Sequence, residues 1–126
     1  MPCPCDPKRL YVDCCARLHR GEPAADAEAL MRSRYSAYVL GLSEYLLATW
    51  HPSTRPRQLD LAEPPDRRTT WLGLAIKRHV DLDDGRAEVE FVARYRVGGT
   101  PARRQRECSR FVREEGAWLY LDGEIG

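Results

Sequence analysis

Apolar residues that recur at helical spacing predict two helices in the first half of the chain. The stripe consists of Met31, Tyr35, Tyr38 and Leu42. This spacing is typical of an amphipathic helix that buries one face. Asp26 is expected to cap the start of this helix and Gly41 its end. Ser43 is expected to cap a second, short helix that continues to Trp50.

Beyond a connection over residues 52–68, rich in Pro, Arg and Asp, apolar and polar residues alternate as they do in strands. Four strands are predicted, over residues 69–80, 86–97, 103–113 and 117–121, with glycine-containing turns between them. In the first strand Leu72, Leu74, Ile76 and Val80 are expected to share one face. In the second strand the shared face is formed by Ala87, Val89, Phe91, Ala93, Tyr95 and Val97. Helices packed on a four-stranded antiparallel meander make an α+β domain.

The length and charge of the chain narrow the classes of partner. The 126 residues suffice for one domain with a small appendage. The 20 basic and 19 acidic residues leave a net charge of +1, so a nucleic-acid or membrane partner is not expected. The arginines of the last strands alternate with Glu107, Glu114 and Glu115, which favours cross-strand charge pairing. The chain has no apolar run of about 20 residues and no signal-peptide pattern, so a cytoplasmic location is predicted.

The strongest chemical signal is a cluster of four cysteines in the first fifteen residues. Cys3, Cys5, Cys14 and Cys15 follow the spacing C-x-C-x8-C-C. Thiolates are ligands for Zn²⁺, and four of them fill a tetrahedral structural site without leaving a position for a catalytic water. A disordered thiol-rich tail and an incidental disulfide are the alternatives, and His19 is a candidate to replace one sulfur. The fifth cysteine, Cys108, is interpreted as a small strand residue without a chemical role.

Longer strings carry a resemblance to known families. The C-P-C-x8-C-C pattern resembles the SEC-C motif, a small zinc-binding module also found at the C-terminus of the SecA translocation ATPase. The segment GEPAADAEALMRSRYSAYVLGLSEYLLATWHPSTRP, with MRSRYSAY as its most specific part, resembles the YchJ (UPF0225) family. WLGLAI and ECSRFVREEGAWLYLDG are similar to the C-terminal half of that family. The resemblance implies a zinc knuckle in residues 1–20 and an NTF2-like cone, helices on a curved sheet, in residues 24–126. Asp6-Pro7-Lys8 stands where the family usually has a Gly-Ser-Gly turn, so a turn with a different backbone is expected there.

Two functions follow from these features. The leading hypothesis is a non-catalytic, cytoplasmic zinc-binding protein whose knuckle contacts a protein partner, by analogy with SecA. The alternative is a small-molecule-binding protein or enzyme that uses the cone. Its candidate cavity residues are Arg34, Tyr35, Trp71, Glu107 and Ser109.

The alternative function depends on what surrounds Glu107 and Arg34. As a site residue Glu107 would be a base or an orienting carboxylate, whereas the structural interpretation pairs it with Arg32 or Arg34. Arg34 either binds an anion or lies on a solvated helix face. His51 is expected to have a structural role, and no nucleophile triad or phosphate-binding loop is present in the sequence.

Overall fold

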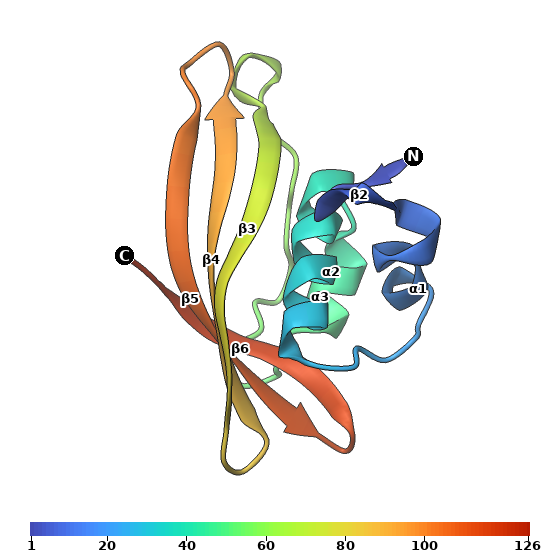
Figure 1. Cartoon of the computed structure of the whole chain (residues 1–126). Coiled ribbons are helices and arrows are strands. Elements are labelled where there is room, and N and C mark those ends of the chain that lie inside the picture. Colours follow the sequence, from blue (N-terminus) through green and yellow to red (C-terminus); the bar gives the residue numbers. More distant parts are fainter.

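The computed structural model describes all 126 residues and has two layers, a curved sheet and a group of helices on its inner side (Figure 1). The main elements are α2 (Ala27–Leu40), α3 (Ser43–Ala48), β3 (Thr69–Leu82), β4 (Arg86–Val97), β5 (Arg103–Glu114) and β6 (Ala117–Ile125). The N-terminal part contains β1 (Pro2–Cys3), β2 (Asp6–Leu10), the 3-10 helix η1 (Tyr11–Asp13) and α1 (Cys15–His19). The strands pair antiparallel in the order β3-β4-β5-β6, which confirms the predicted α+β meander.

Helix α2 forms where its caps and its apolar stripe predict it. The Asp26 carboxylate accepts a hydrogen bond from the Ala29 amide at 2.8 Å, and Gly41 ends the helix with φ 74°, a left-handed conformation. The helix buries Leu30, Met31 and Tyr35 among its apolar residues. It therefore lies between the sheet and the N-terminal elements and contacts both (Figure 1).

The second helix differs from the prediction at both ends. Leu42, not Ser43, is the N-cap of α3, and no side chain caps the helix. Leu42 therefore belongs to the joint between the helices and does not continue the stripe of α2. The helix ends at Ala48 because the chain then turns to pair Trp50 with Tyr120 of β6 in an isolated bridge.

Strand β3 contains two bulges that alter which of its side chains face the helices. The register against β4 shifts between Trp71 and Gly73 and again between Ile76 and Arg78. A bulge adds one residue and so reverses the alternation beyond it. Leu74 and Ile76 pack against the core as predicted. The prediction was wrong for Leu72, which lies in a bulge, and for Val80, which pairs with Glu88 on the outer face.

The two bulges place Trp71 and His79 on the inner face of β3. Trp71 lies opposite Tyr95, and His79 lies opposite the buried Val89. Strand β4 has no bulge against β5 and buries Ala87, Val89, Phe91 and Ala93 as its alternation predicts.

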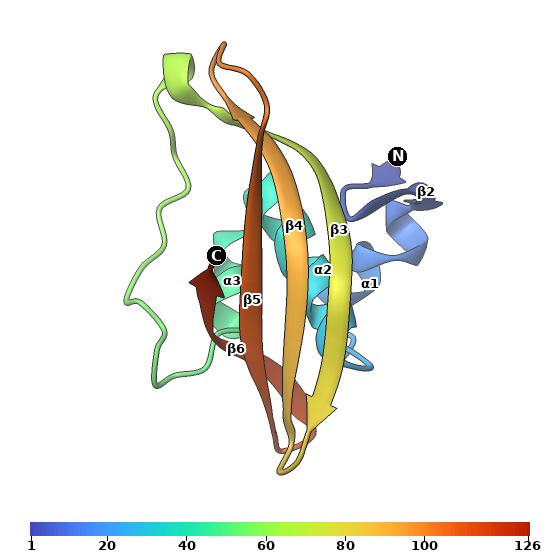
Figure 2. The ribbon, with the colours of Figure 1, turned by 60° about the vertical axis from the view of Figure 1, so that its left-hand side comes forward.

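The connection between α3 and β3 runs as a long, largely extended segment beside the sheet (Figure 2). It includes one turn of 3-10 helix, η2 (Pro65–Arg67), and it ends where the Glu63 carboxylate accepts hydrogen bonds from the Thr69 amide and hydroxyl. No helix of the structure is both long enough and apolar enough to cross a membrane.

Candidate functional site

The four N-terminal cysteines converge on one point beside α2. Cys3 lies on β1, Cys5 lies in the turn between β1 and β2, and Cys14 and Cys15 lie at the junction of η1 and α1. The turn of this hairpin is formed by Pro4 and Cys5, whereas residues 6–8 begin β2. The expectation of a turn at Asp6-Pro7-Lys8 was therefore wrong.

The spacing of the sulfurs fits a tetrahedral metal ion. All four Sγ atoms lie within 4.8 Å of one another, and Cys5 Sγ is 3.6 Å from the Sγ atoms of Cys3 and Cys14. A tetrahedron with Zn–S bonds of about 2.3 Å has edges of about 3.8 Å. All five cysteines of the chain are free thiols, so no disulfide competes for these sulfurs. The cluster thus offers four ligands of one chemical type in the required arrangement.

The thiols alter one another's pKa values. The hydrogen bond from Cys15 lowers the pKa of Cys5 to about 5, whereas burial raises the pKa of Cys14 to about 11. The same bond to Cys5 raises the pKa of Cys15 far above its ordinary value. These contacts favour the thiolate form of Cys5 and the thiol forms of Cys14 and Cys15. A bound divalent cation supplies the charge that four thiolates need, and its binding releases their protons.

Helix α2 provides the groups that surround the cluster. Ser36 is fully buried and donates a hydrogen bond from Oγ to Cys15 Sγ at 3.2 Å. One helical turn earlier, Arg32 donates from Nη1 to the Cys5 carbonyl oxygen at 3.3 Å and from Nε to Glu28 at 3.1 Å. Such outer contacts fix the orientation of metal ligands. Ser36 was not among the residues predicted from the sequence, although its position four residues after Arg32 places both on one face of the helix.

His19 does not take part in the cluster. Its Nε2 donates to the Ser33 carbonyl oxygen at 2.8 Å, so its Nδ1 accepts from the Tyr11 hydroxyl at 2.6 Å. Burial lowers the pKa of His19, which favours this neutral form. Because both ring nitrogens are occupied, His19 holds α1 against α2 and is not available to replace a sulfur.

A second candidate site is a cavity of about 210 Å³ between α2 and the sheet. All five residues that the sequence assigns to a cavity line it, together with six others. The five are Arg34, Tyr35, Trp71, Glu107 and Ser109. Their functional role stays a prediction. The additional lining residues are Met31, Tyr38, Phe91, Ala93, Gln105 and Tyr120.

Arg34 is buried inside the domain, which excludes the solvated helix face as one of its predicted alternatives. Its side chain is 3% exposed and its guanidinium lies over the rings of Trp50 and Tyr120, at 5.1 and 4.5 Å from their centroids. Its Nη1 donates to the Leu46 carbonyl and to Thr49 Oγ1, both at 2.7 Å. Burial lowers the pKa of Arg34. The aromatic contacts partly compensate the lost hydration.

Glu107 forms no salt bridge, which contradicts the predicted pairing with Arg32 or Arg34. Arg32 instead pairs with Glu28, and Arg34 has no carboxylate partner. The Glu107 carboxylate accepts a hydrogen bond from the buried Ser109 hydroxyl at 2.7 Å. Tyr120 lies near both Glu107 and Arg34, and burial is the main cause that raises its pKa to about 12.

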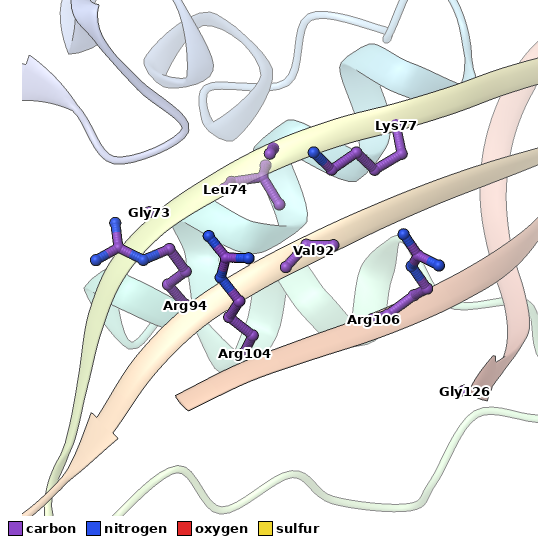
Figure 3. Close-up of a pocket in the computed structure, with 9 residues that line it drawn as sticks. Gly73, Leu74, Lys77, Val92, Arg94, Arg104, Arg106 and Gly126 are labelled. Atoms are coloured by element: carbon purple, nitrogen blue, oxygen red, sulfur yellow. The ribbon is translucent and has the colours of Figure 1, made fainter. Parts of the chain in front are cut away.

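The outer face of the sheet carries a basic hollow of about 490 Å³ (Figure 3). Its cations are Lys77, Arg94, Arg104 and Arg106, which extend from three neighbouring strands around the apolar side chain of Val92 (Figure 3). None of the four forms a salt bridge, and Arg94 lies directly opposite Arg104. The predicted cross-strand pairing holds for Arg110, which contacts Asp122 and Glu124. It was wrong for Arg94, Arg104 and Arg106, which form no salt bridge.

The remaining histidine and cysteine candidates lie outside both sites. His51 Nε2 is 2.8 Å from Glu114 Oε2, and its Nδ1 is 2.7 Å from Ser53 Oγ. This environment ties the loop after α3 to the end of β5. Cys108 lies on β5 opposite Glu90, and burial raises the pKa of its thiol, which opposes nucleophilic reactivity.

Comparisons with known proteins place these features in a family. The model of the YchJ middle NTF2-like domain matches residues 26–123. A UPF0225 protein of Xanthomonas campestris is 56% identical over 121 residues, covering 96% of this chain and 92% of that protein. A UPF0225 protein of Cupriavidus pinatubonensis is 53% identical over 131 residues, covering 98% and 88%.

Solved structures of similar fold cover nearly the whole chain. A SEC-C motif containing protein from Rhodopseudomonas palustris has a TM-score of 0.81 at 36% identity and covers 98% of both chains. A SEC-C motif containing protein from Psychrobacter arcticus has a TM-score of 0.79 at 33% identity, covering 97% of this chain and 81% of that one. The predicted resemblance and the NTF2-like cone are confirmed. This chain belongs to the YchJ (UPF0225) family, with a SEC-C-like cysteine cluster preceding an NTF2-like domain.

Proposed function

We propose that this protein binds Zn²⁺ through Cys3, Cys5, Cys14 and Cys15, and that the resulting knuckle, residues 1–20, is a non-catalytic interaction module. The proposal rests on the convergence of four Sγ atoms within 4.8 Å. Four-thiolate sites of this spacing are typical of structural zinc. Soft sulfur ligands favour Zn²⁺ over the oxygen-preferring Mg²⁺ and Ca²⁺.

A structural role follows from the ligand set. Four cysteines complete a tetrahedral shell, so a water molecule has no position at which the metal could activate it. Three of the cysteines are also buried against α2, at 2–3% exposure, which restricts access to the metal. The metal therefore stabilises the arrangement of β1, β2 and α1 instead of taking part in a reaction.

The surface of the knuckle supports an interaction with a protein partner. Met1, Leu10 and Val12 are large apolar residues with exposed fractions of 65%, 55% and 55%. They lie on the hairpin and the 3-10 turn that the metal would order, because Pro2 pairs with Leu10 and the Tyr11 amide donates to the Met1 carbonyl. Exposed apolar residues that are grouped in this way are typical of contact surfaces. The expected partner is a protein with an apolar docking surface.

Metal analysis tests the first part of the proposal. Purified native protein is expected to contain about one zinc per chain by elemental analysis. A Cys3→Ser/Cys5→Ser variant should lose the metal, whereas Cys108→Ser, on β5 outside the cluster, should retain it. Substitution with Co²⁺ should give the absorption of a tetrahedral thiolate site. The assignment of zinc would be contradicted if the protein bound another metal stoichiometrically or contained no metal.

The interaction is tested separately with a variant that keeps the metal. A partner is defined as a protein that is recovered with the wild type in a fixed ratio. The Leu10→Ser/Val12→Ser variant should retain zinc but no longer recover this partner. Affinity purification followed by quantitative mass spectrometry compares the two. Identical recovery of all proteins by both forms would exclude this surface as an interaction module and leave the metal assignment intact.

A further inference from the structure

The cavity between α2 and the sheet has walls suited to a flat molecule. Its aromatic lining consists of Tyr35, Tyr38, Trp71, Phe91 and Tyr120, contributed by four elements. The rings of Tyr35 and Trp71 meet edge to face, with centroids 5.7 Å apart. The volume of about 210 Å³ is below the roughly 300–1,000 Å³ of pockets for drug-sized ligands. A molecule with one ring matches this size.

Arg34 supplies hydrogen-bond donors to the cavity from the helix side. Only Nη1 donates to protein atoms, so Nε–H and both Nη2–H groups lack protein partners. Trp50 Nε1 is the only buried side-chain nitrogen or oxygen that is both unpartnered and sealed from solvent. The unpartnered Arg34 nitrogens are therefore not sealed from solvent, and Arg34 lines the cavity. A guanidinium that is 3% exposed without a carboxylate partner is rare in a domain of this kind.

Glu107 supplies hydrogen-bond acceptors from the sheet side. Its Oε2 accepts from Ser109, whereas its Oε1 accepts no hydrogen bond from the protein. Gly123 of β6 makes room for this carboxylate, because a Cβ at position 123 would lie 2.7 Å from Glu107 Oε2. The cavity thus presents one fixed cation and one carboxylate that are not paired with each other.

We propose that this cavity binds a small, planar, uncharged molecule that offers a carbonyl-type acceptor to Arg34 and an N–H or O–H donor to Glu107. The aromatic walls favour a ligand with a planar ring. Arg34 favours a hydrogen-bond acceptor on this ligand, and Glu107 favours a donor. A net charge on the ligand would leave one of the two groups facing a like charge in a partly desolvated space. A single-ring carboxamide or cyclic amide has the required chemistry.

Three probes of equal size and similar shape differ in charge and in hydrogen-bonding groups, so they test these properties of the ligand. Benzamide is neutral with both an acceptor and a donor, benzoate is an anion without a donor, and benzamidine is a cation without a carbonyl acceptor. Each probe is titrated to millimolar concentration and followed by ¹H–¹⁵N NMR. The shift of the Trp71 indole N–H resonance should give a lower dissociation constant for benzamide than for either ion. Trp118 does not line the cavity, so its indole N–H serves as an internal reference.

Substitution of the two charged groups should change the order of the probes. Glu107→Gln removes the carboxylate at nearly constant shape, so benzoate should gain about tenfold in affinity through Arg34 and overtake benzamide. Arg34→Met should lose benzamide binding. Glu90→Gln, on the outer face next to Phe91, is the matched control and should retain the wild-type order.

Two results would overturn the proposal. One is the absence of any Trp71 shift with all three probes. The other is an unchanged order of affinities for the three probes in the Glu107→Gln variant. This variant tests the proposal even if the buried Arg34 is necessary for folding. Zinc content is measured in the same samples, so failure of this site is distinguished from failure of the metal site.

Discussion

Ser36 and Ser33 show how neighbouring side chains on one helix serve different parts of the molecule. Both are fully buried on α2. Ser36 donates to the Cys15 sulfur, whereas Ser33 donates to the Leu30 carbonyl and contacts the Tyr45 hydroxyl at 2.7 Å. A donor to a metal-bound thiolate affects the ligand, while a donor within the helix layer affects only packing.

This contrast gives a matched pair of substitutions. Ser36→Ala removes the hydrogen bond to Cys15, so zinc affinity should fall about 10- to 100-fold in chelator competition. Ser33→Ala should leave zinc affinity unchanged and lower the free energy of unfolding by about 1 kcal/mol. Equal zinc affinity in both variants would show that Ser36 contributes only to packing.

Arg94 on β4 and Arg104 on β5 are directly opposed, so two positive charges face each other across this pair of strands. Like charges at opposed positions of a sheet are destabilising. The nearby Lys77 and Arg106 extend over the same hollow and add no acidic partner (Figure 3). The surrounding ladder of β4 and β5 maintains the pair despite the repulsion.

Charge reversal measures this repulsion. Arg94→Glu or Arg104→Glu alone should raise the free energy of unfolding by about 0.5 kcal/mol, because each converts a like-charge pair into an ion pair. The double variant places two glutamates opposite each other and should lose this gain. Urea denaturation at low and high salt gives the measurement, and salt should reduce the differences. Additive effects of the two substitutions would contradict a direct cross-strand interaction.

Elements whose determinants are local were predictable from the sequence. Helix α2 carries its own cap at Asp26 and its own stop at Gly41, and β4 alternates without interruption. The β3 bulges were not predictable, because Leu72 and Val80 fit an unbroken alternation and only pairing with β4 shows the extra residues. The cysteine cluster was evident from spacing alone. The environment of Arg34 was not, because Trp50 and Tyr120 are brought to it from distant parts of the chain.

At the scale of the whole molecule, α2 joins the cysteine cluster to the cone. Cys3, Cys5 and Cys15 belong to the same buried cluster as Leu30 and Phe91. One face of α2 contacts the cysteines and another contacts the sheet. The proposed knuckle therefore has no apolar core separate from that of the domain. Loss of the metal should consequently lower the stability of the chain beyond residues 1–20 as well.

Removal of zinc tests this coupling. If free zinc exceeds its dissociation constant about 1,000-fold, binding stabilises the fold by about 4 kcal/mol. Its removal by a chelator should then lower Tm by roughly 15 °C in a domain of this size. Cys3→Ser/Cys5→Ser should melt at the temperature of the chelated wild type, and Cys108→Ser at that of the zinc-bound protein.

Hydrogen exchange locates the effect along the chain. Because the cysteines pack on α2, chelation should accelerate amide exchange in α1 and in α2, while the β4–β5 ladder should keep most of its protection. Faster exchange confined to residues 1–20, with an unchanged Tm for the remainder, would instead define the knuckle as an independent unit. The shared core favours the first result, since Cys15 belongs to the same buried cluster as Leu30 and Met31 of α2.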